Sequence, residues 1–124
     1  TSALGLHQEV DERLVECCAR DLLDRGCAVA AVSAGARGAF VASASTERLS
    51  AAGTRLAANA SRWSSVEEWV PAVRPQRMVS TNGAGDAASA GLLYGLLVGT
   101  DLRGAARLAA EFAAASIAGD WVVV

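Results

Sequence analysis

The segment from residue 77 to residue 98 constrains the fold of this chain most. Residues 77–80 have the character of a short strand, and the chain then enters the turn Gly83-Ala84-Gly85-Asp86. After this turn it is apolar or small on every side as far as Val98, which predicts a helix that is buried on most of its circumference. A strand that leads through a tight glycine turn into a buried helix is typical of layered α/β proteins.

Further elements are predicted from the spacing of apolar residues. Between residues 10 and 23 these recur at three- and four-residue intervals, which predicts an amphipathic helix that ends before Gly26. Residues 27–33 form a continuous apolar run of the kind that a buried parallel strand shows, and together with residues 39–42 they predict a hairpin. A second helix is expected over residues 102–118, with Asp101 as its N-cap.

Residues 43–76 carry the weakest pattern. We expect one short strand at residues 48–50 within a loop-rich excursion, with Trp63 and Trp69 as anchors that hold it to the core. Residues 121–124 either pair as a strand or form a frayed tail. The order of helix, hairpin, strand, helix and helix indicates an α/β layer structure, and 124 residues is the size of one small domain.

The charged residues exclude several classes of function. The net charge is −2, whereas a protein that binds nucleic acid or a membrane surface by charge would show a basic excess, so we expect neither partner. The chain has no Lys, which excludes a Walker A loop and a Schiff-base mechanism. The longest uncharged apolar run, residues 87–100, is too short to span a bilayer. No secretory signal is visible, so we expect a cytoplasmic protein.

The single His and the three Cys residues give a weak basis for a catalytic triad or a metal site. A Ser-His-Asp triad would depend on His7 alone. Cys17 and Cys18 are adjacent and lack the two-residue spacer that zinc sites use. We therefore expect no structural zinc, and we expect Cys17, Cys18 and Cys27 to be reduced and mostly buried.

The turn at residues 83–86 combines backbone N–H groups with a carboxylate at the start of a helix. A helix N-terminus attracts anions, and glycines at positions 83 and 85 let the backbone approach a phosphate closely. Asp86 would repel a resting phosphate. It is better suited to face an attacking hydroxyl and take its proton, while the N–H groups hold the transferring phosphoryl group.

Three other interpretations of this turn are open. Asp86 can be the capping residue of an ordinary glycine turn. The pattern Gly83-x-Gly85-x-x-Ala88 also matches a variant dinucleotide fingerprint, but that motif needs a following strand with an acidic residue about twenty positions on. Here that window, residues 105–111, has a helical pattern. The small residues at 87–95 also suit tight helix packing for stability alone.

Two motifs resemble a known family. Residues 90–96, together with the preceding Thr81-Asn82-Gly83-Ala84-Gly85-Asp86-Ala87, are similar to the C-terminal signature of the ribokinase-like (PfkB-type) carbohydrate kinases. Residues 32–39 resemble the nucleotide loop of that family, in which Ser or Thr and then Gly-x-x-Gly lie between two strands. The order and spacing of these motifs match over roughly residues 9–118.

The resemblance implies a three-layer α/β/α fold and transfer of the ATP γ-phosphoryl group to a hydroxymethyl group of a sugar or sugar-like molecule. ATP and Mg²⁺ are the implied cofactors, with the metal held mainly through the phosphates and through residues that this chain lacks. Asp86 is the implied catalytic base. The implied anion hole is formed by Gly83, Ala84 and Gly85. The implied nucleotide-binding residues are Ser33, Gly35, Arg37, Gly38, Asn82 and Ala114.

Within that set, Arg37 is expected to reach the phosphates, and Ala114 stands near the adenine where the family frequently has Asn. Ser80 departs from the family pattern, which commonly has Asp or Asn at that position.

The extent of the chain is a further departure from the family. Family members carry an N-terminal half with most of the sheet, the sugar-binding residues and the lid. Residues 1–124 are therefore expected to be a single partial domain, the C-terminal nucleotide-binding segment of a kinase. The alternative is a truncated, non-catalytic nucleotide-binding or interaction domain. Either form would leave a sheet edge and an apolar face uncovered, so we expect self-association.

Overall fold

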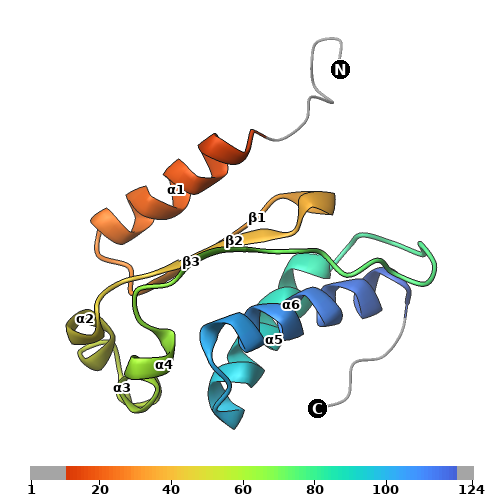
Figure 1. The fold of residues 1–124 in the computed structure, drawn as a ribbon. Coiled ribbons are helices and arrows are strands. Elements are labelled where there is room, and N and C mark those ends of the chain that lie inside the picture. The colour runs from red at the N-terminus through yellow and green to blue at the C-terminus, as the bar shows by residue number, and fades with distance from the viewer. Residues whose placement is uncertain (1–10, 120–124) are drawn as a thin grey trace.

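The structure, a computed structural model, describes residues 11–119, which form three layers (Figure 1). A three-stranded sheet lies in the middle and helix α1 (Glu12–Asp24) covers one of its faces. Helices α5 (Ala84–Val98) and α6 (Leu102–Ile117) lie on the other face. This arrangement confirms the predicted α/β/α class. The predictions for His7 and for residues 121–124 lie outside the described residues.

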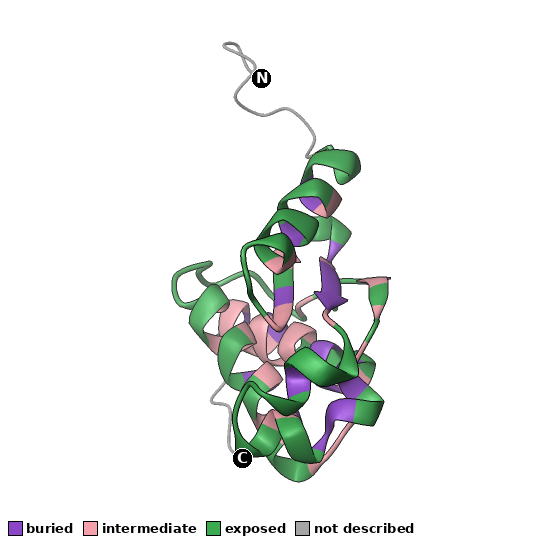
Figure 2. Cartoon of the chain, turned by 90° about the vertical axis from the view of Figure 1, so that its left-hand side faces the viewer, coloured by how far each residue is buried: buried purple, intermediate pink, exposed green. Residues whose placement is uncertain are grey.

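Helix α1 is the predicted amphipathic helix. The Asp11 side chain caps it by accepting the Arg13 N–H at 2.9 Å, and Val15 and Ala19 are buried against the sheet. Most of α1 is exposed (Figure 2). The prediction of mostly buried cysteines is wrong, because all three are free and exposed. On α1 the buried stripe is narrow and contains only Val15 and Ala19, so the helical neighbours Cys17 and Cys18 fall outside it.

The predicted hairpin is present. Strands β1 (Val29–Ser33) and β2 (Ala39–Ser43) are antiparallel, with Val29 opposite Ser43 and Ser33 opposite Ala39. A single 3-10 turn, η1 (Gly35–Arg37), joins them. The interpretation of the first strand as a buried parallel strand is wrong. Within residues 11–119 it pairs only with β2, so it is an edge strand, and of its five residues only Ala30 is buried.

Residues 43–76 contain more regular structure than the sequence predicted. Three short helices occur in this segment, and strand β3 (Glu67–Val70) adds antiparallel to β2. The predicted strand at residues 48–50 is wrong because these residues belong to a helix, where the Ser45 side chain caps the Arg48 N–H and Leu49 is buried. The helices are α2 (Thr46–Ser50), α3 (Thr54–Ala58) and α4 (Ala60–Trp63).

The two tryptophans of this segment are the anchors that the sequence predicted. Trp63 is 2% exposed and its indole N–H donates to the Thr100 carbonyl at 2.7 Å. Trp69 packs against Phe40 with ring centroids 5.5 Å apart, and its indole N–H donates to the Glu16 carboxylate at 2.7 Å. These contacts attach the segment to α1, to the sheet and to the turn before α6.

The sheet has a core on each face because successive side chains of a strand point to opposite sides. Phe40 and Ala42 face α1. The intervening Val41 faces the opposite side and packs in a cluster with Trp63 and Leu102. The sheet is thus the shared wall of two small cores, which fixes the position of the hairpin relative to α6.

Helices α5 and α6 form the predicted helical pair. They approach closely, since a Cβ atom on Gly91 would lie 2.7 Å from the Ala109 Cα atom, and one on Gly95 would lie 2.6 Å from the Ala105 Cα atom. The expectation that α5 is buried on most of its circumference is wrong. Only the glycine face is buried, because α6 covers one side of the helix, and Leu93 remains 58% exposed.

Candidate functional site

A cleft of about 690 Å³ lies where the hairpin tip, α5 and α6 meet. Its walls come from residues 33–39, from residues 70–81, from the first turn of α5 and from one face of α6. It therefore joins the two segments that sequence reasoning associated with a nucleotide, although these lie far apart along the chain.

The hairpin tip forms one wall. Ser33, Gly35 and Gly38 all line the cleft, and the Ala34 N–H closes the loop by donating to the Gly38 carbonyl at 2.7 Å. Gly38 has a φ of +97°, and a Cβ atom there would lie 2.0 Å from the Val70 carbonyl oxygen. Only glycine fits this position, so the hairpin tip is seated directly on the chain that leaves β3.

Arg37 does not line this cleft. Its guanidinium forms an ion pair with the Glu12 carboxylate at 3.1 Å, on the side of the hairpin tip that faces α1. The sequence grouped Arg37 with Ser33, Gly35 and Gly38, but the structure places only the other three residues on the cleft wall.

The first turn of α5 forms a second wall. Gly83 is the N-cap in the left-handed conformation, with a φ of +83°, and Ala84 and Gly85 line the cleft. The Ala84 N–H donates to the Thr81 carbonyl at 3.3 Å. The N–H groups of residues 83, 85 and 86 have no acceptor within residues 11–119. A 15-residue helix whose first N–H groups are unpaired attracts an anion at this end.

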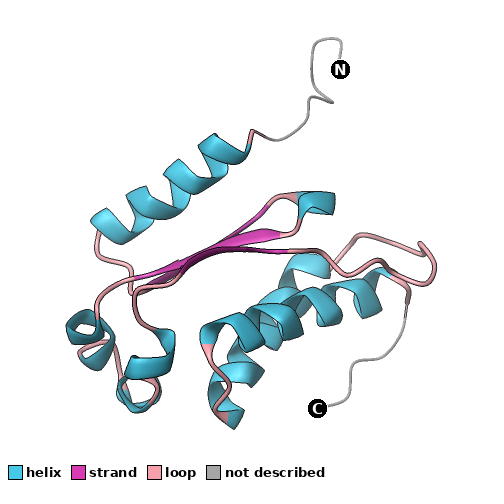
Figure 3. Ribbon diagram, viewed as in Figure 1, coloured by secondary structure: helices cyan, strands magenta, loops and turns pink. Residues whose placement is uncertain are grey.

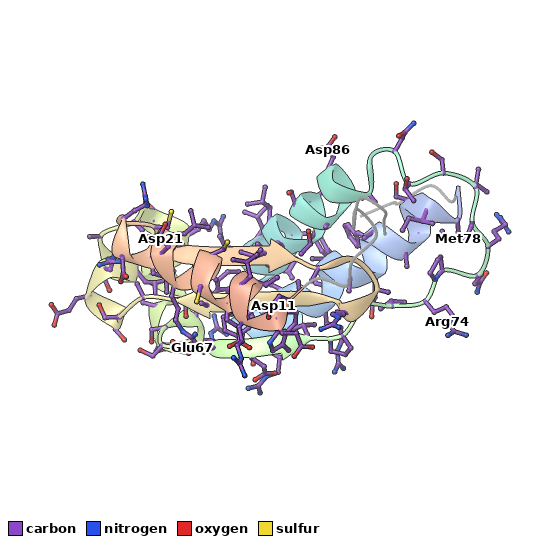
Figure 4. All side chains as sticks on the ribbon, turned by 90° about the horizontal axis from the view of Figure 1, so that it is seen from above. Asp11, Asp21, Glu67, Arg74, Met78 and Asp86 are labelled. Atoms are coloured by element: carbon purple, nitrogen blue, oxygen red, sulfur yellow. The ribbon has the colours of Figure 1, made fainter. Side chains whose placement is uncertain are left out.

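Asp86 and Asn82 lie beside the cleft, outside its walls. Asp86 occupies the first turn of α5, is exposed, and points outward from the ribbon (Figure 4). Its carboxylate has no hydrogen-bond or ion-pair partner within the described part of the chain. Gly85 therefore separates a cleft on one side from a free carboxylate on the other.

Residues 3–119 match the model of the pfkB family of carbohydrate kinases. The chain belongs to this family. No match was found among curated protein sequences. The family assignment agrees with the resemblance that the two motifs indicated.

Solved structures of nucleoside, adenosine and sugar kinases are similar to this chain over most of its length. The inosine complex of the Burkholderia thailandensis nucleoside kinase is 28% identical, with a TM-score of 0.58, and the match covers 79% of this chain and 26% of that one. The adenosine kinase from Sinorhizobium meliloti is 25% identical, with a TM-score of 0.60 and coverage of 94% and 29%. A probable sugar kinase from Rhizobium etli CFN 42 is 26% identical, with a TM-score of 0.56 and coverage of 79% and 24%. This chain thus spans between 24% and 29% of these kinases.

The segment before the pfkB signature is not the strand that the sequence predicted. Residues 71–82 run as a loop (Figure 3), and the N–H groups of Val79 and Ser80 both donate to the Ile117 carbonyl, at 2.8 and 3.2 Å. The Arg77 side chain donates to the Ala118 carbonyl at 2.9 Å. The segment is irregular because its donors are directed to the end of α6 and not to a strand.

Ser80, where the pfkB family commonly has Asp or Asn, has a definite contact. Its hydroxyl oxygen accepts the Asn82 N–H at 3.1 Å. A serine oxygen two residues before a backbone N–H forms a small local turn. Ser80 therefore shapes the approach to Gly83 without adding charge.

Helix α6 supplies an apolar wall. Ala110, Ala113, Ala114 and Ile117 line the cleft, and Ala114 is itself buried. The position of α6 also removes the dinucleotide interpretation of the turn, because the acidic residue that motif requires would have to follow a strand and here the chain is helical.

Residues 11–119 contain no group of three or more His, Cys, Asp or Glu side chains that could hold a metal ion. None of the residues that line the cleft is acidic. In the described part of the chain, no helix has the length and apolar character needed to cross a membrane.

Proposed function

We propose that this chain provides the phosphate-binding turn and the catalytic base of an ATP-dependent kinase. The acceptor is a hydroxymethyl group of a sugar or a sugar-bearing molecule such as a nucleoside. The observation that carries the proposal is that the Ser33–Gly38 loop and the N-terminus of α5 line one cleft. Membership in the pfkB family and the nucleoside and sugar kinases among the similar structures support the class of reaction.

The proposed chemistry follows from the two sides of Gly85. The γ-phosphoryl group of ATP is held at the α5 N-terminus, where the N–H groups of Gly83 and Gly85 are unpaired and the helix dipole favours negative charge. The acceptor hydroxyl approaches from the side of Asp86, and its proton passes to that carboxylate. The hydroxyl oxygen forms a bond to the γ-phosphorus while the bond to the β-phosphate bridging oxygen breaks, which releases ADP.

The nucleotide is proposed to lie along the cleft. Ser33, Gly35 and Gly38 bring backbone and hydroxyl groups to its ribose and phosphates, and the alanine face of α6 around Ala114 packs against the adenine ring. Asn82 lies on the turn that leads to the phosphates. Mg²⁺ would supply charge neutralisation on the β- and γ-phosphates when it is bound with ATP.

A non-catalytic nucleotide-binding or interaction domain is the second candidate. It is favoured by the exposed Leu93 and Leu97 on α5. A single-turnover assay separates the two candidates. ATP labelled at the γ-phosphate is mixed with the chain and a panel of sugars and nucleosides. Transfer of label to an acceptor supports the kinase, whereas ADP and ATP binding without transfer supports the second candidate.

A further inference from the structure

One charged residue lines the cleft. Among the described residues that line it, Arg74 is the only charged one. A nucleoside triphosphate carries several negative charges, so a cleft that binds it and has no Lys must rely on backbone N–H groups and on whatever Arg it contains. Sequence reasoning assigned that part to Arg37, which the structure pairs with Glu12.

Arg74 lies close to the hairpin tip. It follows Pro71 and Ala72, whose backbone atoms would lie within 3 Å of a Cβ atom on Gly38. Figure 4 shows its side chain on the segment that leaves β3. Arg74 is exposed and has no hydrogen-bond or ion-pair partner within residues 11–119.

Several other arginines of the described chain are already engaged in ion pairs. Arg20 pairs with Glu67, Arg25 pairs with Asp21, and Arg103 pairs with Glu68. Arg74 differs from them in two respects, because its guanidinium is unpaired and it lines a cleft without acidic residues. An unpaired guanidinium presents its N–H groups in a fixed fork that matches two phosphate oxygens.

We propose that Arg74 binds the phosphate groups of the nucleotide in this cleft. The inference rests on the proposed function and adds the residue that supplies the positive charge. Phosphate is a better match for Arg74 than the base. The base is a flat ring that can pack on the apolar α6 wall at Ala113, Ala114 and Ile117. Arg37 then serves to fix the hairpin tip to α1 through Glu12.

The test compares ADP with adenosine, which has the same base and ribose but no phosphate. Calorimetric titrations of the full chain are made with wild type, Arg74→Ala, Arg74→Lys, Arg37→Ala and, as a distant control, Arg55→Ala. Arg74→Ala is expected to weaken ADP binding about tenfold, the usual cost of losing a charged hydrogen bond. Adenosine affinity should stay within twofold of wild type. Arg74→Lys should recover part of the lost ADP affinity, and Arg55→Ala should bind ADP as tightly as wild type.

Three results would overturn the inference and leave the proposed function intact. In the first, wild type binds ADP and Arg74→Ala binds it equally well. In the second, Arg37→Ala loses more ADP affinity than Arg74→Ala. In the third, Arg74→Ala weakens adenosine as much as ADP, which would make Arg74 a contact of the base. If folded wild type binds neither ligand, the proposed function fails and the inference fails with it. A circular-dichroism melt of each variant shows that the fold is retained.

Discussion

A Cβ atom on Gly38 would lie 2.0 Å from the carbonyl oxygen of Val70, so the two backbones approach more closely here than any residue with a side chain would allow. This contact seats the tip of the β1–β2 hairpin on the end of β3. It thereby sets the hairpin loop, which lines the cleft with Ser33 and Gly35, against the segment that carries Arg74.

Replacement of Gly38 should therefore disrupt the fold at the cleft. Gly38→Ala is expected to lower the free energy of unfolding by at least about 2 kcal/mol, because the methyl group clashes with backbone and the φ of +97° is strained for alanine. Gly35→Ala is the matched control, since it has a φ of +58° but nothing within 4 Å of its Cβ position. It should cost about 1 kcal/mol. Urea unfolding measures both, and equal losses would contradict the account.

Gly85→Ala should separate stability from binding. Gly85 lies inside α5 with open space at its Cβ position, so alanine should raise the free energy of unfolding by roughly 0.5 kcal/mol. Gly85 also lines the cleft, and the added methyl group should weaken ADP binding by about tenfold. Urea unfolding and calorimetry check the two halves. Unchanged ADP affinity in this variant would mean that no phosphate approaches Gly85.

Asp86→Asn tests the proposed base. Asp86 is exposed and has no side-chain partner in the described residues, so the variant should change the free energy of unfolding by less than about 1 kcal/mol. In the active protein, turnover should fall by about 10²–10⁴-fold, the usual worth of a general base, while ADP affinity stays near wild type. Steady-state kinetics and calorimetry are the measurements. Near-normal turnover would reduce Asp86 to a helix-capping residue.

The exposed face of α5 should drive self-association. Leu93 and Leu97 are 58% and 57% exposed and lie one turn apart on α5. We expect wild type to associate as its concentration rises a hundredfold in sedimentation experiments. Leu93→Ser with Leu97→Ser should reduce this, whereas Leu14→Ser, on a 62% exposed residue of α1, should not. A wild type that stays monomeric throughout would contradict this prediction.

The elements that the sequence predicted well are those with local signals. Helix α6 has an N-cap at Asp101, whose side chain accepts the Gly104 N–H at 2.8 Å, and the hairpin has a glycine-bearing loop. Strand β3 was missed because it begins with Glu67 and Glu68. These carboxylates are neutralised by Arg20 and Arg103, which come from helices on the two opposite faces of the sheet. The local sequence around β3 does not show that these distant arginines will pair with its glutamates.

The residues of the candidate site also fall into those with a local sequence signal and those without one. The positions of Ser33, Gly38 and Gly85 could be predicted because glycine loops between regular elements have recognisable motifs. Arg74 could not be predicted as a residue of the cleft wall, because it lies in a segment without periodicity that is placed beside the hairpin tip only by the fold. The signal that was available is weaker: Arg74 belongs to a chain that has no Lys at all.

The central claim is that two distant loops of this chain form one nucleotide site, and an ADP titration followed by ¹H–¹⁵N NMR tests it most directly. At millimolar ADP the account predicts amide shifts at Ser33, Gly35 and Gly38 and at Gly83 and Gly85 that follow a single binding curve. Residues of α3, which do not line the cleft, should not respond. A folded sample in which both loops stay silent, or in which only one of them shifts, would contradict the account.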